Sequence, residues 1–189
     1  MPGRGAREKQ QENVLLAAQQ AAADGKIHAV TITDNPGGRP AIMASSLGQE
    51  IVQLGIEPLV HFTCKDKNRN QIESELYALN RSGIRNLLVM TGDYPMEGFL
   101  GRPKPVFDLD PIHILELINS MNQGMKAVTP QGTTNYQPAD FFAGSVVSPF
   151  KALEAELLGQ YYKLKKKINH HSSFIVTQLG FDARKFHEV

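Results

Sequence analysis

Residues 83–93 read Gly-Ile-Arg-Asn-Leu-Leu-Val-Met-Thr-Gly-Asp, and this stretch decides the fold. Gly83 follows an amphipathic segment and is the residue type that most often ends a helix in the left-handed conformation. The run at 86–90 is short and, after Asn86, entirely apolar, which is typical of a strand buried on both faces of a parallel sheet. Polar residues follow it at once. The stretch therefore predicts a helix-to-strand junction of an α/β protein, with polar residues at the carboxyl end of the strand.

The same pattern recurs along the chain. Four more short apolar runs, rich in β-branched residues, are predicted to be buried strands: residues 27–33, 59–63, 141–147 and 174–177. They alternate with segments of helical periodicity, and most of them start about 30 residues apart. Such alternation is typical of right-handed βαβ units in a parallel sheet. The sequence therefore predicts about five parallel βα units.

The predicted units are too few for a complete barrel. An eight-unit (β/α)8 barrel takes about 250 residues, whereas this sequence has 189. It enters a helix near residue 6 with no strand before it, and residues 184–189 have the pattern of a helix that has just begun. We therefore expect residues 1–189 to form a single, incomplete TIM-barrel domain whose first and last strands are missing. Two stretches rich in proline and glycine, 94–108 and 129–139, are expected to be loops.

Composition excludes several classes of function. With 20 basic and 19 acidic residues the net charge is +1, which provides no field for capturing nucleic acid or an anionic membrane. No apolar run approaches the roughly 20 residues of a membrane span. The chain has a single cysteine, Cys64, and therefore no internal disulfide. We expect Cys64 to be a buried core residue. The adjacent pair His170-His171 is not expected to bind metal, because sequential side chains rarely converge. We predict a cytoplasmic protein.

Polar residues follow four of the predicted strands, at 31–35, 61–64, 91–93 and 177–178. Parallel strands of a barrel bring their carboxyl ends to one rim, where several side chains can meet one ligand. We therefore expect one rim to carry four polar side chains: Thr31, His61, Asp93 and Gln178.

Three motifs identify a family. Pro-Leu-Val-His-Phe-Thr-Cys at 58–64, the stretch at 83–93 and Phe-Ile-Val-Thr-Gln-Leu-Gly-Phe-Asp at 174–182 occur in an order and spacing that resemble the methylenetetrahydrofolate reductase family. The resemblance covers most of the chain. It implies a barrel that binds FAD, takes hydride from NADH or NADPH, and reduces 5,10-methylenetetrahydrofolate to 5-methyltetrahydrofolate in one-carbon metabolism and methionine biosynthesis.

The resemblance assigns roles to particular residues. Asp93 matches a catalytic aspartate near the flavin and the folate, where a carboxylate would stabilise positive charge on the folate. Gln178 matches a glutamine that contacts the pterin or the nicotinamide, since an amide both donates and accepts hydrogen bonds. His61 matches a histidine that contacts the flavin, although a histidine at a strand end is equally often only hydrogen-bonded within the protein.

Further flavin-binding positions are implied at Thr31, Thr91 and Gly92, with Thr91 standing where the family often has an arginine. The helix after residues 148–149 carries an apolar stripe: Leu153, Leu157, Tyr161, Leu164 and Ile168. Lys163 and Lys167 border that stripe, and Lys167 matches a family cation near the FAD diphosphate. A lysine run is otherwise a solvated helix face.

One feature of the family has no counterpart. Its general acid is a glutamate in a Phe-Glu pair on the first strand, and no residue here replaces it. We therefore expect the chain alone to be weak or inactive as a reductase. Two alternatives stay open: a folate-dependent methyltransferase-like barrel, slightly favoured by Asp34-Asn35, and a non-enzymatic remnant that binds flavin or folate. Open sheet edges would favour a homo-oligomer or pairing with a complementary fragment.

Overall fold

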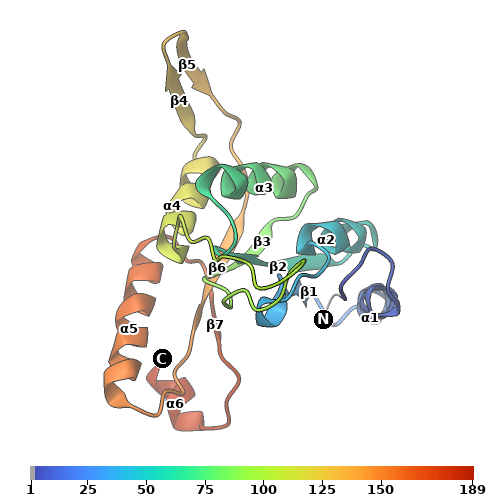
Figure 1. Ribbon diagram of the computed structural model, residues 1–189, viewed down its shortest axis with the longest axis vertical. Coiled ribbons are helices and arrows are strands. Elements are labelled where there is room, and N and C mark those ends of the chain that lie inside the picture. The colour runs from blue at the N-terminus through green and yellow to red at the C-terminus, as the bar shows by residue number, and fades with distance from the viewer. Residues whose placement is uncertain (1–2) are drawn as a thin grey trace.

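The computed structural model describes residues 3–189 and shows a curled, five-stranded parallel sheet (Figure 1). In order across the sheet the strands are β1 (Ala29–Ile32), β2 (Glu57–Thr63), β3 (Asn86–Met90), β6 (Phe142–Val147) and β7 (Ile175–Thr177). All neighbouring pairs are parallel. This confirms the predicted α/β fold as part of a (β/α)8 barrel.

Helices precede, connect and follow the strands of the sheet. They are α1 (Lys9–Asp24), α2 (Ala44–Gln53), α3 (Arg69–Arg81), α4 (Pro111–Asn122), α5 (Glu154–Asn169) and α6 (Ala183–Glu188), with a short 3-10 helix, η1, at Pro36–Gly38. The Asn68 side chain caps α3 by accepting the Gln71 N–H, and Asp110 caps α4 by accepting the His113 N–H. Gly83, which follows the C-cap residue Ser82 of α3, has φ 74°, the left-handed conformation predicted for a glycine that ends a helix.

The hydrophobic core lies between helices α1 to α4 and the face of the sheet that they cover. Alternate strand residues point to this face, since side chains alternate along a strand: Val60 and Phe62 in β2, and Leu87 and Val89 in β3. They pack with a set of fully buried helix residues: Leu47, Ile51, Ile72, Leu76, Ile114 and Leu115. The intervening strand residues face the other side of the sheet, where the candidate site lies.

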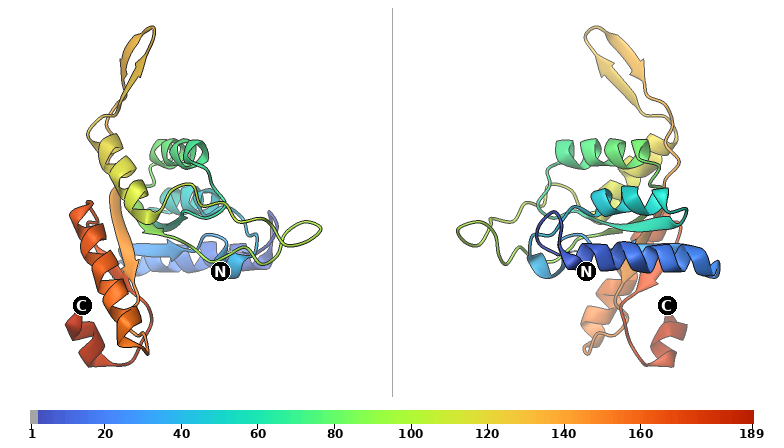
Figure 2. Two further views of the ribbon diagram at one scale, coloured as in Figure 1. Left: turned by 60° about the vertical axis from the view of Figure 1, so that its left-hand side comes forward. Right: turned by 90° about the vertical axis from the view of Figure 1, so that its right-hand side faces the viewer.

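Between α4 and β6 the chain forms an antiparallel hairpin. Its strands are β4 (Lys126–Thr129) and β5 (Gly132–Asn135). It stands away from the rest of the molecule in every view (Figures 1 and 2). The prediction that residues 129–139 form only a loop was therefore wrong. All four residues of β5 are exposed. A strand is predicted from alternating apolar and polar residues, and an exposed strand has no buried face that requires this alternation.

One other expectation is corrected in detail. The apolar stripe of α5 is buried only in its middle, at Leu157 and Leu164, whereas Leu153 and Ile168 are 64% and 53% exposed. Leu153 is the residue that precedes the helix, so its side chain is outside the helical face. None of the helices within residues 3–189 is long and apolar enough to cross a membrane. The cytoplasmic location stays a prediction.

Candidate functional site

A cleft of ≈ 650 Å³ opens on the side of the sheet turned away from helices α1 to α4. Every site residue predicted from the sequence lines it: Thr31, His61, Thr91, Gly92, Asp93, Lys163, Lys167 and Gln178. They come from β1, β2, the turn after β3, α5 and the residue that follows β7. Parallel strands deliver their carboxyl ends to one rim, which explains why residues far apart in the sequence meet here. Their individual roles stay predictions.

The floor of the cleft is apolar. It is made by side chains from β2, β3, β6 and β7: Leu59, Leu88, Met90, Val146 and Val176. A mostly apolar surface with a few polar groups around it is the usual lining of a site for a small organic ligand. The volume of the cleft also lies within the usual range for such sites, about 300–1,000 Å³.

His61 is held by its neighbour on β1. The Thr31 hydroxyl and His61 Nε2 are 2.9 Å apart, within hydrogen-bond distance. Burial lowers the pKa of His61, and the nearby Asp34 carboxylate only partly opposes this. His61 is therefore a neutral hydrogen-bonding group at neutral pH, and the positive charge in the cleft comes from other side chains.

Asp93 stands at the rim, in the turn that follows β3. Its Oδ2 accepts the backbone N–H of Gly37 at 2.8 Å. Gly37 belongs to η1, the turn that follows β1. A charge-assisted hydrogen bond of this kind restricts the carboxylate to one orientation, so the loop after β1 determines where Asp93 points.

A pair of lysines from α5 forms one wall of the cleft. Lys167 Nζ donates to the carbonyl of Val146 in β6 at 2.6 Å. Burial lowers the pKa of Lys167, and the nearby charge of Lys163 lowers it further. Within residues 3–189 no ion pair joins either lysine to a carboxylate. Two cations that repel each other, with no acidic partner, are suited to binding an anion.

The cleft also contains polar residues that were not singled out from the sequence. Gln160 lies three residues before Lys163 and seven before Lys167, and so shares their helix face. Ser148 follows β6 directly. Both could have been found, Gln160 by helical spacing from the lysines and Ser148 by the rule for polar residues at strand ends.

Two residues considered from the sequence lie elsewhere. The Asp34 carboxylate accepts hydrogen bonds from the Thr63 hydroxyl at 2.6 Å and from Lys67 Nζ at 3.1 Å, and it is not among the residues that line the cleft. It therefore gives no support to a methyltransferase-like site. Cys64 is fully buried, as predicted, and burial and then Asp110 raise the pKa of its thiol to about 12. It is an unreactive core residue.

Comparisons with known proteins agree with the motifs. The family model of methylenetetrahydrofolate reductase matches residues 5–189. A curated relative, the 5,10-methylenetetrahydrofolate reductase of Pectobacterium carotovorum subsp. carotovorum, is 26% identical over 132 residues, which cover 70% of this chain and 37% of the relative.

A solved structure has a similar fold. It is an uncharacterized protein from Clostridium thermocellum that binds two copies of 5-methyl-5,6,7,8-tetrahydrofolic acid. It matches with a TM-score of 0.61 and 12% identity over 99% of this chain and 55% of its own length. The chain thus spans little more than a third of the curated relative and about half of the structural one. The resemblance found in the three motifs is confirmed, and the chain belongs to the methylenetetrahydrofolate reductase family.

Proposed function

We propose that the cleft is part of the folate- and flavin-binding site of a 5,10-methylenetetrahydrofolate reductase that uses NADH or NADPH. The observation that carries this proposal is the meeting of a carboxylate, an amide and two lysines around one apolar floor. Family membership supports folate-related reduction, and the Clostridium thermocellum protein with a similar fold binds a reduced folate. Both relatives are longer than this chain.

The residues present fit FAD. Lys163 and Lys167 would pair with its diphosphate, because they are cations without an acidic partner within residues 3–189. Thr31 and His61 would offer hydrogen-bonding atoms to the flavin ring above the apolar floor. When bound, FAD would supply the hydride transfer between nicotinamide and folate, which no side chain can perform.

Asp93 and Gln178 would act on the folate. A carboxylate at the rim stabilises positive charge that develops on the substrate, and the effect is larger where the site excludes water. It also accepts hydrogen bonds from the amino groups of a pterin. Gln178 would orient the pterin or the nicotinamide with its amide. Asp93 is the carboxylate that lines the cleft within residues 3–189.

A separate proton donor is missing from this scheme. A positioned general acid typically contributes about 10²–10⁴-fold to the rate. None of the cleft-lining residues within residues 3–189 is assigned that role, so we expect NAD(P)H oxidation with 5,10-methylenetetrahydrofolate by residues 1–189 to be slower, by a factor of this order, than in a reductase that has such an acid.

The test is a calorimetric titration of the chain with 5-methyltetrahydrofolate, with and without FAD. We expect folate binding that Asp93→Asn weakens by about 10-fold or more, the effect of losing a hydrogen bond to a charged group. Asp24→Asn, at the end of α1, is the control and should leave binding unchanged. If the chain binds the folate but does not bind FAD, the result would favour the methyltransferase-like alternative. Binding of neither ligand would overturn the proposal.

A further inference from the structure

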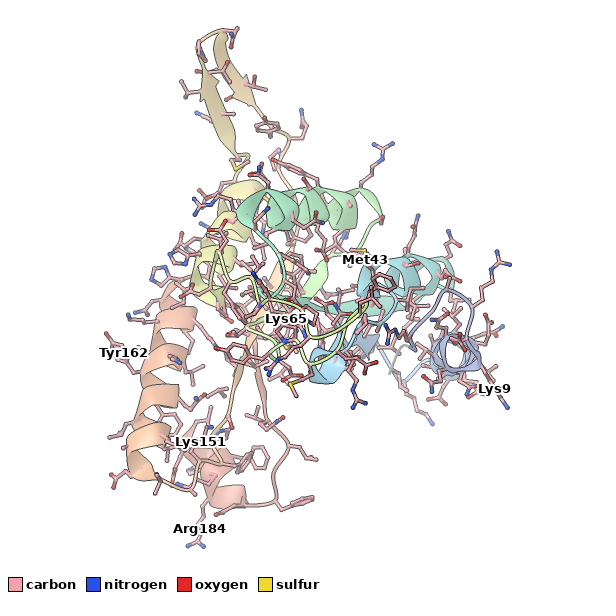
Figure 3. The ribbon with its side chains drawn as sticks, in the orientation of Figure 1. Lys9, Met43, Lys65, Lys151, Tyr162 and Arg184 are labelled. Carbon is pink, nitrogen blue, oxygen red and sulfur yellow. The ribbon has the colours of Figure 1, made fainter. Side chains whose placement is uncertain are left out.

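We propose that Lys65 is a positioning residue for Asp93, acting through the loop after β1. The inference rests on the proposed role of Asp93, but the contacts that carry it do not. Lys65 lies two residues beyond the end of β2 and is 1% exposed. Figure 3 shows it at the centre of the molecule, among the loops at the ends of the strands. It is not among the residues that line the cleft.

Lys65 lies directly behind the turn that carries Asp93. Its backbone N–H donates to the carbonyl of Thr91 at 3.2 Å. A Cβ on Gly92 would approach Lys65 Cγ and Cδ to 3.0 Å, so the lysine stem packs against this glycine. The side chain therefore supports the turn from the side opposite the cleft.

The head group of Lys65 holds the neighbouring loop. Its Nζ donates to the carbonyl of Asn35 at 2.8 Å. A buried amino group is costly unless it is hydrogen-bonded, so this contact is strongly favoured. Asn35 has φ 39° and Gly37 has φ 66°, both in the left-handed region. These conformations turn the loop so that the Gly37 N–H reaches Asp93 Oδ2 at 2.8 Å.

A second contact joins the same two loops. Gly38 accepts the N–H of Met96 at 2.8 Å, and a Cβ on Gly38 would lie 1.9 Å from the carbonyl oxygen of Tyr94. The loop after β1 and the segment after Asp93 therefore lie in direct contact. Lys65 is hydrogen-bonded to the loop after β1 at Asn35 and to the turn that carries Asp93 at Thr91, so it contributes to fixing their relative position.

The loop after β1 is held at its start, Asp34, by a different lysine, Lys67. The effect of Lys65 on this loop can therefore be tested separately. Lys67 Nζ contacts Asp34 Oδ2 at 3.1 Å and Glu75 Oε2 at 2.9 Å. This buried cluster keeps Asp34 in place whether or not Lys65 can donate. Replacing Lys65 by methionine would keep a stem of similar length and remove the bond to Asn35. We expect the loop to stay attached at Asp34 while the Gly37 N–H loses its alignment with Asp93.

The first test is independent of any ligand. In the intact chain the amide proton of Gly37 should resonate downfield because it bonds a carboxylate, and Asp93→Asn should move it upfield. Lys65→Met should cause a similar upfield shift, Lys65→Arg should largely restore the original position, and the exposed Lys151→Met should have no effect. A Gly37 resonance that Lys65→Met leaves in place would overturn the inference, whatever the fate of the proposed function.

The second test uses a double-mutant cycle with 5-methyltetrahydrofolate as the probe. Lys65→Met should weaken binding by about 3- to 10-fold, the effect of one hydrogen bond, and by less than about 2-fold in an Asp93→Asn background. Equal losses in both backgrounds would mean that Lys65 acts only on general stability and would overturn the inference. If Lys65→Met does not fold, the Lys65→Arg variant carries the same cycle, with partial loss expected only when Asp93 is present.

Discussion

His61 and Lys167 face the same cleft, and burial shifts the pKa of each downward, in the direction that favours the uncharged form. The consequences differ because their ordinary values differ. The histidine is neutral at neutral pH, whereas a lysine starts about four units higher and keeps its charge. The cleft therefore combines an uncharged hydrogen-bonding group at one position with a partly desolvated cation at another. A phosphate-bearing ligand would neutralise that cation.

Binding of FAD to this chain should depend on pH through Lys167. A bound diphosphate would raise the pKa of Lys167, which burial and Lys163 lower in the free protein. Binding therefore takes up protons, and the affinity should fall as pH rises through the lowered pKa of the free lysine toward the ordinary lysine value. Fluorescence titration with FAD at several pH values measures this directly.

The same experiment has a matched pair of variants. Lys167→Gln should weaken FAD binding by about 3- to 30-fold and remove most of its pH dependence. Lys166→Gln should do neither, because Lys166 lies over the Tyr162 ring at 4.9 Å and does not line the cleft. Equal effects of the two substitutions would contradict the assignment of Lys167 to the diphosphate.

At the scale of the elements, the strands were predictable and some of the connections were not. The stretch that begins at Gly83 predicted β3 to the residue, because a helix-ending glycine and an abrupt change to polar residues mark its two ends. The exposed β5 left no such signal. Lys65 was also missed, since its partner is a backbone carbonyl 30 residues away, and no spacing in the sequence predicts that contact.

The long loop before α4 was predicted, but its attachment was not. Its last part is bound to the start of α3, where Arg69 Nε and Nη2 donate to the two oxygens of Asp108 at 3.0 and 2.9 Å. The hydrogen bonds from Arg69 lower the pKa of Asp108 to about 2. A fork-shaped contact of this kind fixes geometry as well as charge.

Asp108→Asn should release the end of this loop. We expect faster amide exchange at Asp66, whose N–H donates to the Val106 carbonyl, and little change in the sheet. Because the folded-state pKa of Asp108 lies below its unfolded value, its contribution is complete above about pH 4 and is lost as pH falls through about 2. The difference in amide exchange at Asp66 between the unchanged chain and Asp108→Asn should therefore be largest above about pH 4 and should disappear as pH falls through about 2. Asp140→Asn, which removes an exposed pair with Arg85, is the control.

At the scale of the whole molecule, the sheet is open on two sides. Within residues 3–189, β1 and β7 each have a single strand neighbour. The inner face also leaves apolar groups accessible, among them Phe142 at 50% and Val176 at 38% exposure. Unpaired edges next to apolar surface favour association with another strand or another copy of the chain.

We expect this chain to self-associate as its concentration rises. Val176→Lys places a charge on the edge strand β7 and should shift the sedimentation profile toward the monomer, because charged residues on an edge oppose strand pairing. Val128→Lys, on the exposed hairpin, should leave the profile unchanged. If the chain stays monomeric at every concentration, the open edges are not association sites. If Val128→Lys has the larger effect, the hairpin is the contact.

The most direct measurement of the proposed site is amide chemical-shift mapping of the labelled chain with FAD and then 5-methyltetrahydrofolate. We expect the largest changes with FAD at residues along the cleft, from Thr31 and Gly92 to Lys167, and further changes with the folate around Asp93 and Gln178. Two results would contradict the assignment of this cleft as the flavin and folate site. One is that the changes fall mainly on helices α1 to α4 or on the hairpin, and the other is that neither ligand causes a saturable change.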